Sequence, residues 1–333
     1  MSTFSSATPY RFCVAPMLDW TDRHCRYFHR LLSPQARLYT EMVTAAALYY
    51  GDAAKHLDFD AAEHPLALQL GGSDPAMLAH AARLGARWDY DEINLNCGCP
   101  SARVQSGSFG ACLMKEPTLV ADCVRAMRDA VTIPVTVKHR IGVDAIEDYG
   151  FVRDFVGAVH EAGCDVFILH ARNAILSGLS PKENREIPPL RYEAAQQLKR
   201  DFPQCTIVLN GGLTDWTTIE AQLATGIDGV MVGRWAYHQP YCLAEAEARL
   251  FNSAALPPPL PTRRAIIEAM IPYIETQLRQ SVPLRAMTRH LLGLYHGQPR
   301  ARWFRQRLSD SQQLERQSVE VLREALALME GDV

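Results

Sequence analysis

The chain has 333 residues, is 48% hydrophobic and carries a formal net charge of −3, so it holds enough apolar material for one large barrel or two ordinary domains. This composition excludes a disordered chain, and no run of about 18 apolar residues indicates a membrane span. The first twelve residues lack the basic start and apolar run of a signal peptide. We therefore expect a cytoplasmic protein. Its nine scattered cysteines favour reduced thiols over a secreted disulfide framework.

Short apolar or β-branched runs recur along the first 240 residues, and each is followed by a segment with helical spacing of its apolar residues. The predicted strands cover 11–17, 37–43, 66–72, 90–96, 134–142, 166–172, 205–212 and 229–235. Strands that alternate with helices indicate a parallel sheet with crossover helices. Eight such repeats with continuously apolar strands favour a closed (β/α)8 barrel over an open doubly wound sheet.

The last part of the chain has a different pattern. The run LPPPLP at 256–261 predicts a stiff linker, and the segments beyond it show helical apolar stripes. We predict a barrel domain over residues 1–250 and a small all-helical domain over residues 257–333. Residues 263–307 carry nine arginines, no lysine and two acids, and planar guanidinium groups match phosphate oxygens. An anionic polymer is therefore a plausible partner.

Polar side chains follow several predicted strands at their C-terminal ends, where (β/α)8 barrels assemble active sites. Glycines at 211–212 and at 233 allow backbone N–H groups to approach an anion, which predicts a phosphate-bearing cofactor. Lys138 and His170 could neutralise an electron-rich ring, and the Gln69 amide suits the edge of a heterocycle. A glycine pair alone is more often a turn, and a lone lysine or histidine more often structural. Their joint occurrence at five strand ends favours a site.

The stretch EINLNCGCPS at 92–101 places two cysteines at the end of a buried strand. A zinc site lacks a second ligand pair at finger-like spacing, and a disulfide between residues two apart would be strained. Two inert core thiols are the remaining plain interpretation. Cys99, however, lies between Gly98 and Pro100 on a loop of defined shape just past the strand. We predict that Cys99 is a general acid and that Cys97 packs in the core.

Long motifs in the chain resemble the tRNA-dihydrouridine synthases, and the loop at 177–190 resembles the DusA branch of that family. The resemblance spans nearly the whole chain. The motifs that carry it are VAPMLDWTD (14–22), YTEMV (39–43), LALQLGGSDP (66–75), YDEINLNCGCPSARVQSGSFGACLMKEP (90–117), PVTVKHRIGVD (134–144), HARNAILSGLSPKENREIPPL (170–190), LNGG (209–212), DGVMVGRWAY (228–237) and MTRHLLGLYHG (287–297).

The resemblance implies an FMN enzyme that reduces the C5=C6 bond of a uridine in the tRNA D-loop, at positions 20 and 20a, with NADPH as the electron source. Reduced flavin would deliver hydride to C6 while the Cys99 thiol gives a proton to C5. The positions that match FMN-binding residues are Pro16, Met17, Leu18, Gln69, Lys138, His170, Asn210, Gly211, Gly212, Gly233 and Arg234. Asn96 matches a position that faces the target uridine. The positions that match tRNA-seating residues are Lys182, Arg185, Arg302 and Arg305.

Two other functions fit parts of the sequence. One is a flavin barrel of the dihydroorotate dehydrogenase or enoate reductase type that acts on a free small molecule, but such a substrate has no use for an arginine-rich helical tail. The other is an RNA-binding module on a degenerate barrel, which the presence of Cys99, Lys138 and His170 disfavours. We expect no metal, no DNA partner and no membrane partner, and we favour a monomer.

Overall fold

The computed structural model describes residues 9–251 and 259–330. Residues 256–258 of the predicted linker lie outside this described part. The described chain divides into two compact units, the first formed by residues 9–18, 37–59 and 64–232 and the second by residues 19–36, 60–63, 233–251 and 259–330. Within the described residues, every helix is too short or too polar to cross a lipid bilayer.

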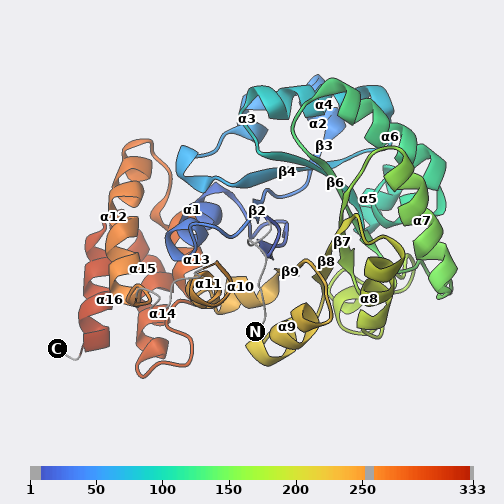
Figure 1. Ribbon diagram of the computed structural model, residues 1–333. Coiled ribbons are helices and arrows are strands. Elements are labelled where there is room, and N and C mark those ends of the chain that lie inside the picture. The colour runs from blue at the N-terminus through green and yellow to red at the C-terminus, as the bar shows by residue number, and fades with distance from the viewer. Residues whose placement is uncertain (1–8, 252–258, 331–333) are drawn as a thin grey trace. The chain divides into compact units, whose positions relative to one another are not determined.

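The first unit is built on one parallel sheet (Figure 1). Its strands are β1 Phe12–Val14, β2 Leu38–Tyr39, β3 Val43–Thr44, β4 Leu66–Gly71, β5 Glu92–Cys97, β6 Val135–Arg140, β7 Val166–His170, β8 Thr206–Asn210 and β9 Gly229–Val232. The strand order is β1-β9-β8-β7-β6-β5-β4-β2, and β3 also pairs with β4. Each of the eight predicted runs contains a strand, and the run at 37–43 contains β2 and the start of β3.

The two ends of this strand order meet, so the sheet closes on itself. Cys13 in β1 forms a parallel bridge with Arg37, the residue before β2. The Arg37 amide donates to the Phe12 carbonyl at 3.0 Å, and the Val14 amide donates to the Arg37 carbonyl at 2.9 Å. A closed sheet has no exposed edge. The predicted (β/α)8 barrel is therefore confirmed, and the helical C-terminal region is present as well.

Helices of the first unit lie on the outside of the sheet (Figure 1). They are α2 Ala45–Tyr50, α3 Ala53–Leu57, α4 Pro75–Arg87, α5 Ala102–Ser106, α6 Pro117–Ala130, α7 Tyr149–Glu161, α8 Tyr192–Asp201 and α9 Trp216–Ala224, with 3-10 turns η2 Gly110–Lys115 and η3 Glu183–Arg185. Side-chain caps fix where several begin, because the Asp74 carboxylate accepts from the Met77 amide at 2.8 Å and the Asp215 carboxylate accepts from the Thr218 amide at 2.7 Å.

The second unit is helical and combines segments that are far apart in the sequence. Its elements are α1 Arg23–Leu32, η1 Ala61–Glu63, α10 Arg234–His238, α11 Cys242–Ala246, η4 Glu247–Phe251, α12 Arg263–Arg279, α13 Leu284–Leu291, α14 Ala301–Ser309, α15 Ser311–Leu314 and α16 Glu320–Glu330. Asp22 caps α1 by accepting from the backbone amides of His24 and Cys25. The same carboxylate forms ion pairs with Arg289 and His290 of α13, so a single side chain joins α1 to the C-terminal helices.

These units do not follow the single boundary near residue 250 that the sequence suggested. Residues 19–36, 60–63 and 233–250 belong to the helical unit by their contacts, although they lie within the predicted barrel range. The ion pairs of Asp22 with Arg289 and His290 and the buried Arg26–Glu63 ion pair, at 2.6 Å, lie within this unit and join 19–36 to 60–63 and to the C-terminal helices. The division of labour between a catalytic and a tRNA-binding domain stays a prediction.

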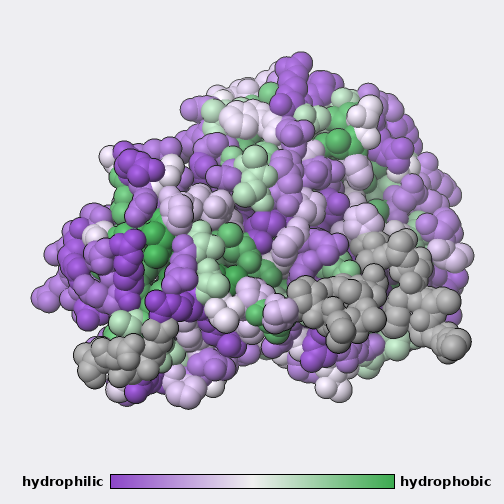
Figure 2. All heavy atoms as spheres, turned by 60° about the vertical axis from the view of Figure 1, so that its left-hand side comes forward, coloured by the Kyte–Doolittle hydropathy of each residue, from purple (hydrophilic) through white to green (hydrophobic). Residues whose placement is uncertain are grey.

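Hydrophobic side chains are mostly buried in both units. On the face drawn in Figure 2, hydrophilic side chains cover most of the surface and hydrophobic ones lie in small groups between them. Large hydrophobic side chains that are well exposed include Leu18 (66%), Tyr50 (75%) and Trp303 (52%). Scattered exposed residues of this kind are normal for a folded domain.

A substitution at the closing seam tests the barrel. A Cβ at Gly229 would overlap the Tyr10 backbone carbonyl oxygen, where β9 pairs with β1. We expect Gly229→Ala to destabilise the protein by about 1–3 kcal/mol, seen as a lower midpoint of urea denaturation. Gly157→Ala in helix α7 is the matched control. Its Cβ would meet only Phe202, at 3.7 Å, so the better helix propensity of alanine should raise stability by up to about 1 kcal/mol. An unchanged midpoint for Gly229→Ala would contradict the described closure.

Candidate active site

Five predicted site residues of the first unit lie on neighbouring strands near their C-terminal ends: Gln69, Asn96, Lys138, His170 and Asn210. The strand register places Asn96 beside Lys138 and His170 beside Asn210. Parallel strands bring all their C-terminal ends to one rim of the barrel. The structure therefore gathers these side chains on one rim, as the sequence predicted.

Lys138 is partly buried, and its pKa is lowered. Its Nζ donates to Asn210 Oδ1 at 3.1 Å, and Asn210 Nδ2 donates to the Met231 carbonyl at 2.7 Å, which holds the amide in one orientation. Burial, together with the positive charge of Arg140, lowers the pKa of Lys138 to about 7. An anion bound nearby would stabilise the protonated lysine.

His170 is neutral at physiological pH. Burial lowers its pKa well below the usual value, and the charges of Arg140, Lys138, Arg172 and Arg185 act in the same direction. The neutral imidazole offers one donor and one acceptor in a cationic neighbourhood. An anionic ligand is the natural complement to such a neighbourhood.

The two glycines after β8 bring the backbone close to His170. Gly211 and Gly212 have positive φ values of 112° and 67°, which L side chains rarely adopt. A Cβ at Gly211 would also lie 2.6 Å from His170 Cδ2, and a Cβ at Gly212 would overlap Leu190. This rim therefore needs bare backbone, as a phosphate-binding turn does.

Cys99 lies on a loop that is held from both sides. Asn96 Oδ1 accepts from the backbone amides of Gly98 and Cys99, each at 3.0 Å, and Arg140 Nε donates to the Gly98 carbonyl at 3.1 Å. The Cys99 carbonyl accepts from the Ala111 amide at 2.9 Å. Together these bonds fix the loop that carries the thiol.

The Cys99 thiol is accessible and Cys97 is not. Cys99 is partly exposed, and its Sγ lies 3.5 Å from Ser101 Oγ. Cys97 is fully buried, and burial raises the pKa of its thiol. The structure thus separates a partly exposed cysteine from one that packs in the core.

The loop at 177–190 contributes charge to the same rim. Asn184 is buried, and its side chain bonds to the Ile175 backbone through both Oδ1 and Nδ2. Arg140 Nη1 donates to the Asn184 carbonyl at 3.1 Å. Lys182 and Arg185 are exposed, and the charge of Arg185 affects the pKa values of both Arg140 and His170. Arg185 is therefore close to the site, and no contact places Lys182 there.

Three site residues carry functions that sequence reasoning did not assign. Arg140 bonds to both the Cys99 loop and the 177–190 loop, and burial lowers its pKa to about 9. Arg172 donates to the Glu186 and Pro188 carbonyls, and Asn184 organises the loop. Arg140 and Arg172 were visible as polar strand ends, which was the available signal. Nothing in the sequence marked Asn184.

The other predicted residues lie as follows. Pro16, Met17 and Leu18 follow β1 in the first unit, and Met17 packs against the barrel core. Gly233 and Arg234 begin α10 in the second unit, directly after β9 in the chain. Arg302 and Arg305 are exposed on α14, also in the second unit. Among the described residues, neither arginine has a hydrogen-bond or ion-pair partner. The cofactor-binding and tRNA-binding roles of all these residues stay predictions.

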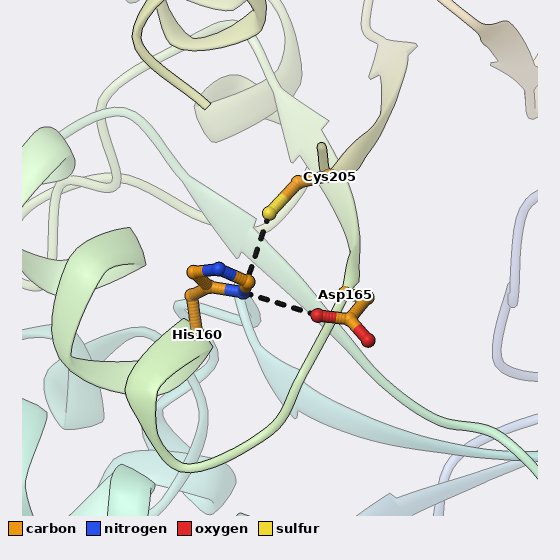
Figure 3. Close-up of side chains that lie close together, drawn as sticks. All are labelled: His160, Asp165 and Cys205. Atoms are coloured by element: carbon orange, nitrogen blue, oxygen red, sulfur yellow. Dashed lines mark hydrogen bonds and ion pairs between the residues drawn. The ribbon is translucent and has the colours of Figure 1, made fainter. Parts of the chain in front are cut away.

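A cluster of possible metal ligands lies at the N-terminal ends of β7 and β8. Figure 3 shows Asp165 and Cys205 pointing at the His160 ring, with Nδ1 3.1 Å from Asp165 Oδ1 and 3.4 Å from Cys205 Sγ. Burial and the Asp165 charge raise the pKa of the Cys205 thiol to about 11. His160 Nδ1 also lies 3.1 Å from the Cys164 carbonyl. We interpret the cluster as hydrogen-bonded packing, and the expectation of no metal stays a prediction.

The fold and the rim define a (β/α)8-barrel enzyme with a partly exposed cysteine, Cys99, on the loop that follows β5. Comparison with known proteins makes this more specific. The family model described as "Dihydrouridine synthase (Dus)" matches residues 13–330. The chain belongs to the dihydrouridine synthase family, and the predicted resemblance is confirmed.

Two relatives show how complete the match is. A tRNA-dihydrouridine(20/20a) synthase of Xanthomonas campestris is 58% identical over 306 residues, which cover 91% of this chain and 89% of the relative. A tRNA-dihydrouridine(20/20a) synthase of Pseudomonas putida is 55% identical over 339 residues, which cover 99% of this chain and all of the relative (100%).

Two solved structures share the barrel fold at low sequence identity. A 2-naphthoyl-CoA reductase complex has a TM-score of 0.55 at 11% identity and covers 71% of this chain and 49% of its own. The structure of TcOYE with pHBA has a TM-score of 0.53 at 11% identity and covers 77% of this chain and 92% of its own. At this identity the likeness concerns the fold alone.

The pKa of Lys138 makes a prediction about stability. Above about pH 7 the folded state loses the Lys138 proton, whereas the unfolded state keeps it up to about pH 10.4. The unfolded state therefore binds more protons in this window, so the contribution of Lys138 to stability rises with pH. Relative to Lys138→Met, the wild-type protein should gain stability between pH 7 and pH 10. Urea denaturation of both proteins, freed of bound small molecules, measures this, and parallel pH dependences would contradict the shift.

Proposed function

We propose that this chain reduces uridine to 5,6-dihydrouridine in the D-loop of tRNA, at positions 20 and 20a, with FMN as cofactor and NADPH as electron donor. The observation that carries the proposal is the accessible Cys99 thiol on a fixed loop at the rim of a dihydrouridine synthase barrel. The names of the relatives, tRNA-dihydrouridine(20/20a) synthase, support the substrate and the positions. We further propose that the protein works in the cytoplasm as a monomer.

The rim fits an anionic flavin nucleotide. Gly211 and Gly212 leave room that a Cβ would fill, which suits the close approach of a phosphate. Lys138 and the neutral His170 would supply hydrogen-bonding groups for the ring, and Gln69 lies on β4, two strands from Lys138. We propose that these residues, with Pro16, Met17, Leu18, Asn210, Gly233 and Arg234, hold FMN.

The chain's own residues orient the base and supply a proton. When bound, reduced FMN supplies the hydride that adds to C6 of the uracil ring. The Cys99 thiol donates its proton to C5, so the C5=C6 double bond becomes a single bond and the resulting thiolate is reprotonated from solvent. Asn96 bonds to the Cys99 backbone, so it can orient the base and the thiol together. Arg140, bonded to the Gly98 carbonyl, keeps the loop in place.

We propose that exposed cations bind the tRNA phosphates. The target base must leave its stack to reach the rim, which costs a few kcal/mol, and D-loop bases are already partly splayed. Phosphate contacts from Lys182, Arg185, Arg302 and Arg305 offset this cost. Arg302 and Arg305 suit this role because, within the described residues, no acid pairs with either of them.

The thiol assignment is tested by exchanging the two cysteines separately. We expect Cys99→Ala to keep bound FMN and NADPH oxidation but to lower dihydrouridine formation by about 10²–10⁴-fold, the usual contribution of a positioned acid. Cys97→Ala is the control, and it should keep activity because Cys97 is buried away from the rim. The measurements are flavin absorbance, NADPH oxidation and dihydrouridine content of tRNA. Equal dihydrouridine formation in both variants would exclude Cys99 as the acid.

The arginine pair separates a tRNA enzyme from a reductase of free small molecules. Arg302→Ala with Arg305→Ala should weaken tRNA binding and reduce the slope of log K against log salt by about 1–2, because up to two phosphate contacts are lost. The flavin content should not change. Arg323→Ala is the control, since this exposed arginine is paired with Glu320. Unchanged tRNA affinity in the double variant would remove these arginines from the interface.

A further inference from the structure

A continuous chain of side-chain hydrogen bonds runs through the barrel interior to the Cys99 loop. Thr136 Oγ1 lies 2.5 Å from Glu92 Oε1, and Asn94 Nδ2 lies 2.8 Å from Thr136 Oγ1. Gln69 Nε2 lies 2.8 Å from Asn94 Oδ1, and Asn96 Nδ2 lies 2.9 Å from Gln69 Oε1. All five side chains are buried. The chain thus links a buried carboxylate to the amide that holds the reactive loop.

The loop end of this chain fixes the orientation of every amide in it. The backbone amides of Gly98 and Cys99 can only donate, so Asn96 must present Oδ1 to them. Its Nδ2 then faces Gln69, which must accept through Oε1. Gln69 Nε2 in turn donates to Asn94 Oδ1, and Asn94 Nδ2 donates to Thr136.

The carboxylate end independently requires the same direction. Glu92 accepts from Arg37 Nη1 at 3.1 Å and from the Tyr39 hydroxyl at 3.0 Å. Burial raises the pKa of Glu92, and the Arg37 charge opposes that rise. Two donors are thus already aimed at the carboxyl oxygens, which act as acceptors. The Thr136 hydroxyl therefore donates to Glu92, which leaves its oxygen free to accept from Asn94. The hydrogen-bond direction required by the Cys99 loop and the direction required by Glu92 are therefore the same at Thr136.

We propose that Thr136 is a positioning residue that sets the orientation of the Gln69 and Asn96 amides. This inference deepens the proposed function, on which it rests. Among these hydrogen-bonded side chains, the Thr136 hydroxyl is the group that donates to the Glu92 carboxylate and also accepts from the Asn94 amide. The fixed position of the carboxylate therefore determines the orientation of the amides through Thr136. Through it, the Asn96 oxygen faces the Cys99 loop while the second hydrogens of Gln69 Nε2 and Asn96 Nδ2 remain available to ligands.

The test replaces the hydroxyl while keeping the shape of the side chain. Thr136→Val leaves Asn94 Nδ2 without an acceptor, so the Asn94, Gln69 and Asn96 amides lose their common orientation. At saturating FMN we expect about tenfold slower dihydrouridine formation, the effect of one lost hydrogen bond. Thr136→Ser retains the hydroxyl and should restore the rate. The rate of Cys99 alkylation should change in the valine variant and recover in the serine variant.

Thr288→Val is the matched control. Thr288 is fully buried, and among the described residues its hydroxyl has no hydrogen-bond partner, so its replacement should leave the rate unchanged. A wild-type protein that forms no dihydrouridine would sink the proposed function itself. An active wild type with an equally active Thr136→Val, or a serine variant as slow as the valine variant, would overturn the positioning role alone.

A measurement on the wild-type protein covers the case in which the valine variant does not fold. A neutron crystal structure locates the hydroxyl hydrogen of Thr136 directly. We expect it on the line to Glu92 Oε1. A hydrogen that points to Asn94 instead would overturn the inference.

Discussion

The buried ion pair between Arg37 and Glu92 is the interaction on which much of the barrel depends. The Arg37 backbone closes the sheet because its amide donates to Phe12 and its carbonyl accepts from Val14, both in β1. The Arg37 guanidinium forms an ion pair with Glu92 in β5. One residue therefore ties the closing seam to β5, the second strand from β2 in the sheet order. Two buried charges are expensive to desolvate, and loss of either partner leaves the other uncompensated. The pair is thus tolerated only in a closed barrel, where further donors complete the carboxylate.

Much of the fold was predictable because buried parallel strands and amphipathic helices leave separate periodic signals. All eight predicted runs contain strands. The run at 37–43 holds two short strands instead of one, because its Thr40 hydroxyl bonds to the Glu41 carbonyl and also accepts from the Gln69 amide. The composition of the two units was not predictable. It depends on contacts such as those of Asp22 with Arg289 and His290, which join residues more than 260 positions apart.

The candidate site was predictable where its polar side chains lie at the C-terminal ends of strands. Lys138, His170 and Asn210 follow from position alone, since parallel strands share one rim. Thr136 was not predicted, and Asn94 was noted only as a polar strand-end residue without a role, because their partners lie on neighbouring strands and the register is invisible in the sequence. Glu92 is similar, because an acid next to Asp91 at the start of a predicted strand gives no sign that Arg37 and Tyr39 surround it. Sequence therefore indicates which groups meet a ligand, and structure shows which groups orient them.

The low pKa of Lys138 also couples the binding of a negative ligand to the uptake of a proton from the solvent. At neutral pH this amine is divided between its two protonation states, and a negative ligand stabilises the charged one. Filling the rim with such a ligand therefore draws hydrogen ions from the buffer. At alkaline pH the negative ligand then binds more weakly, because Lys138 must take up a proton for the charged form to be present.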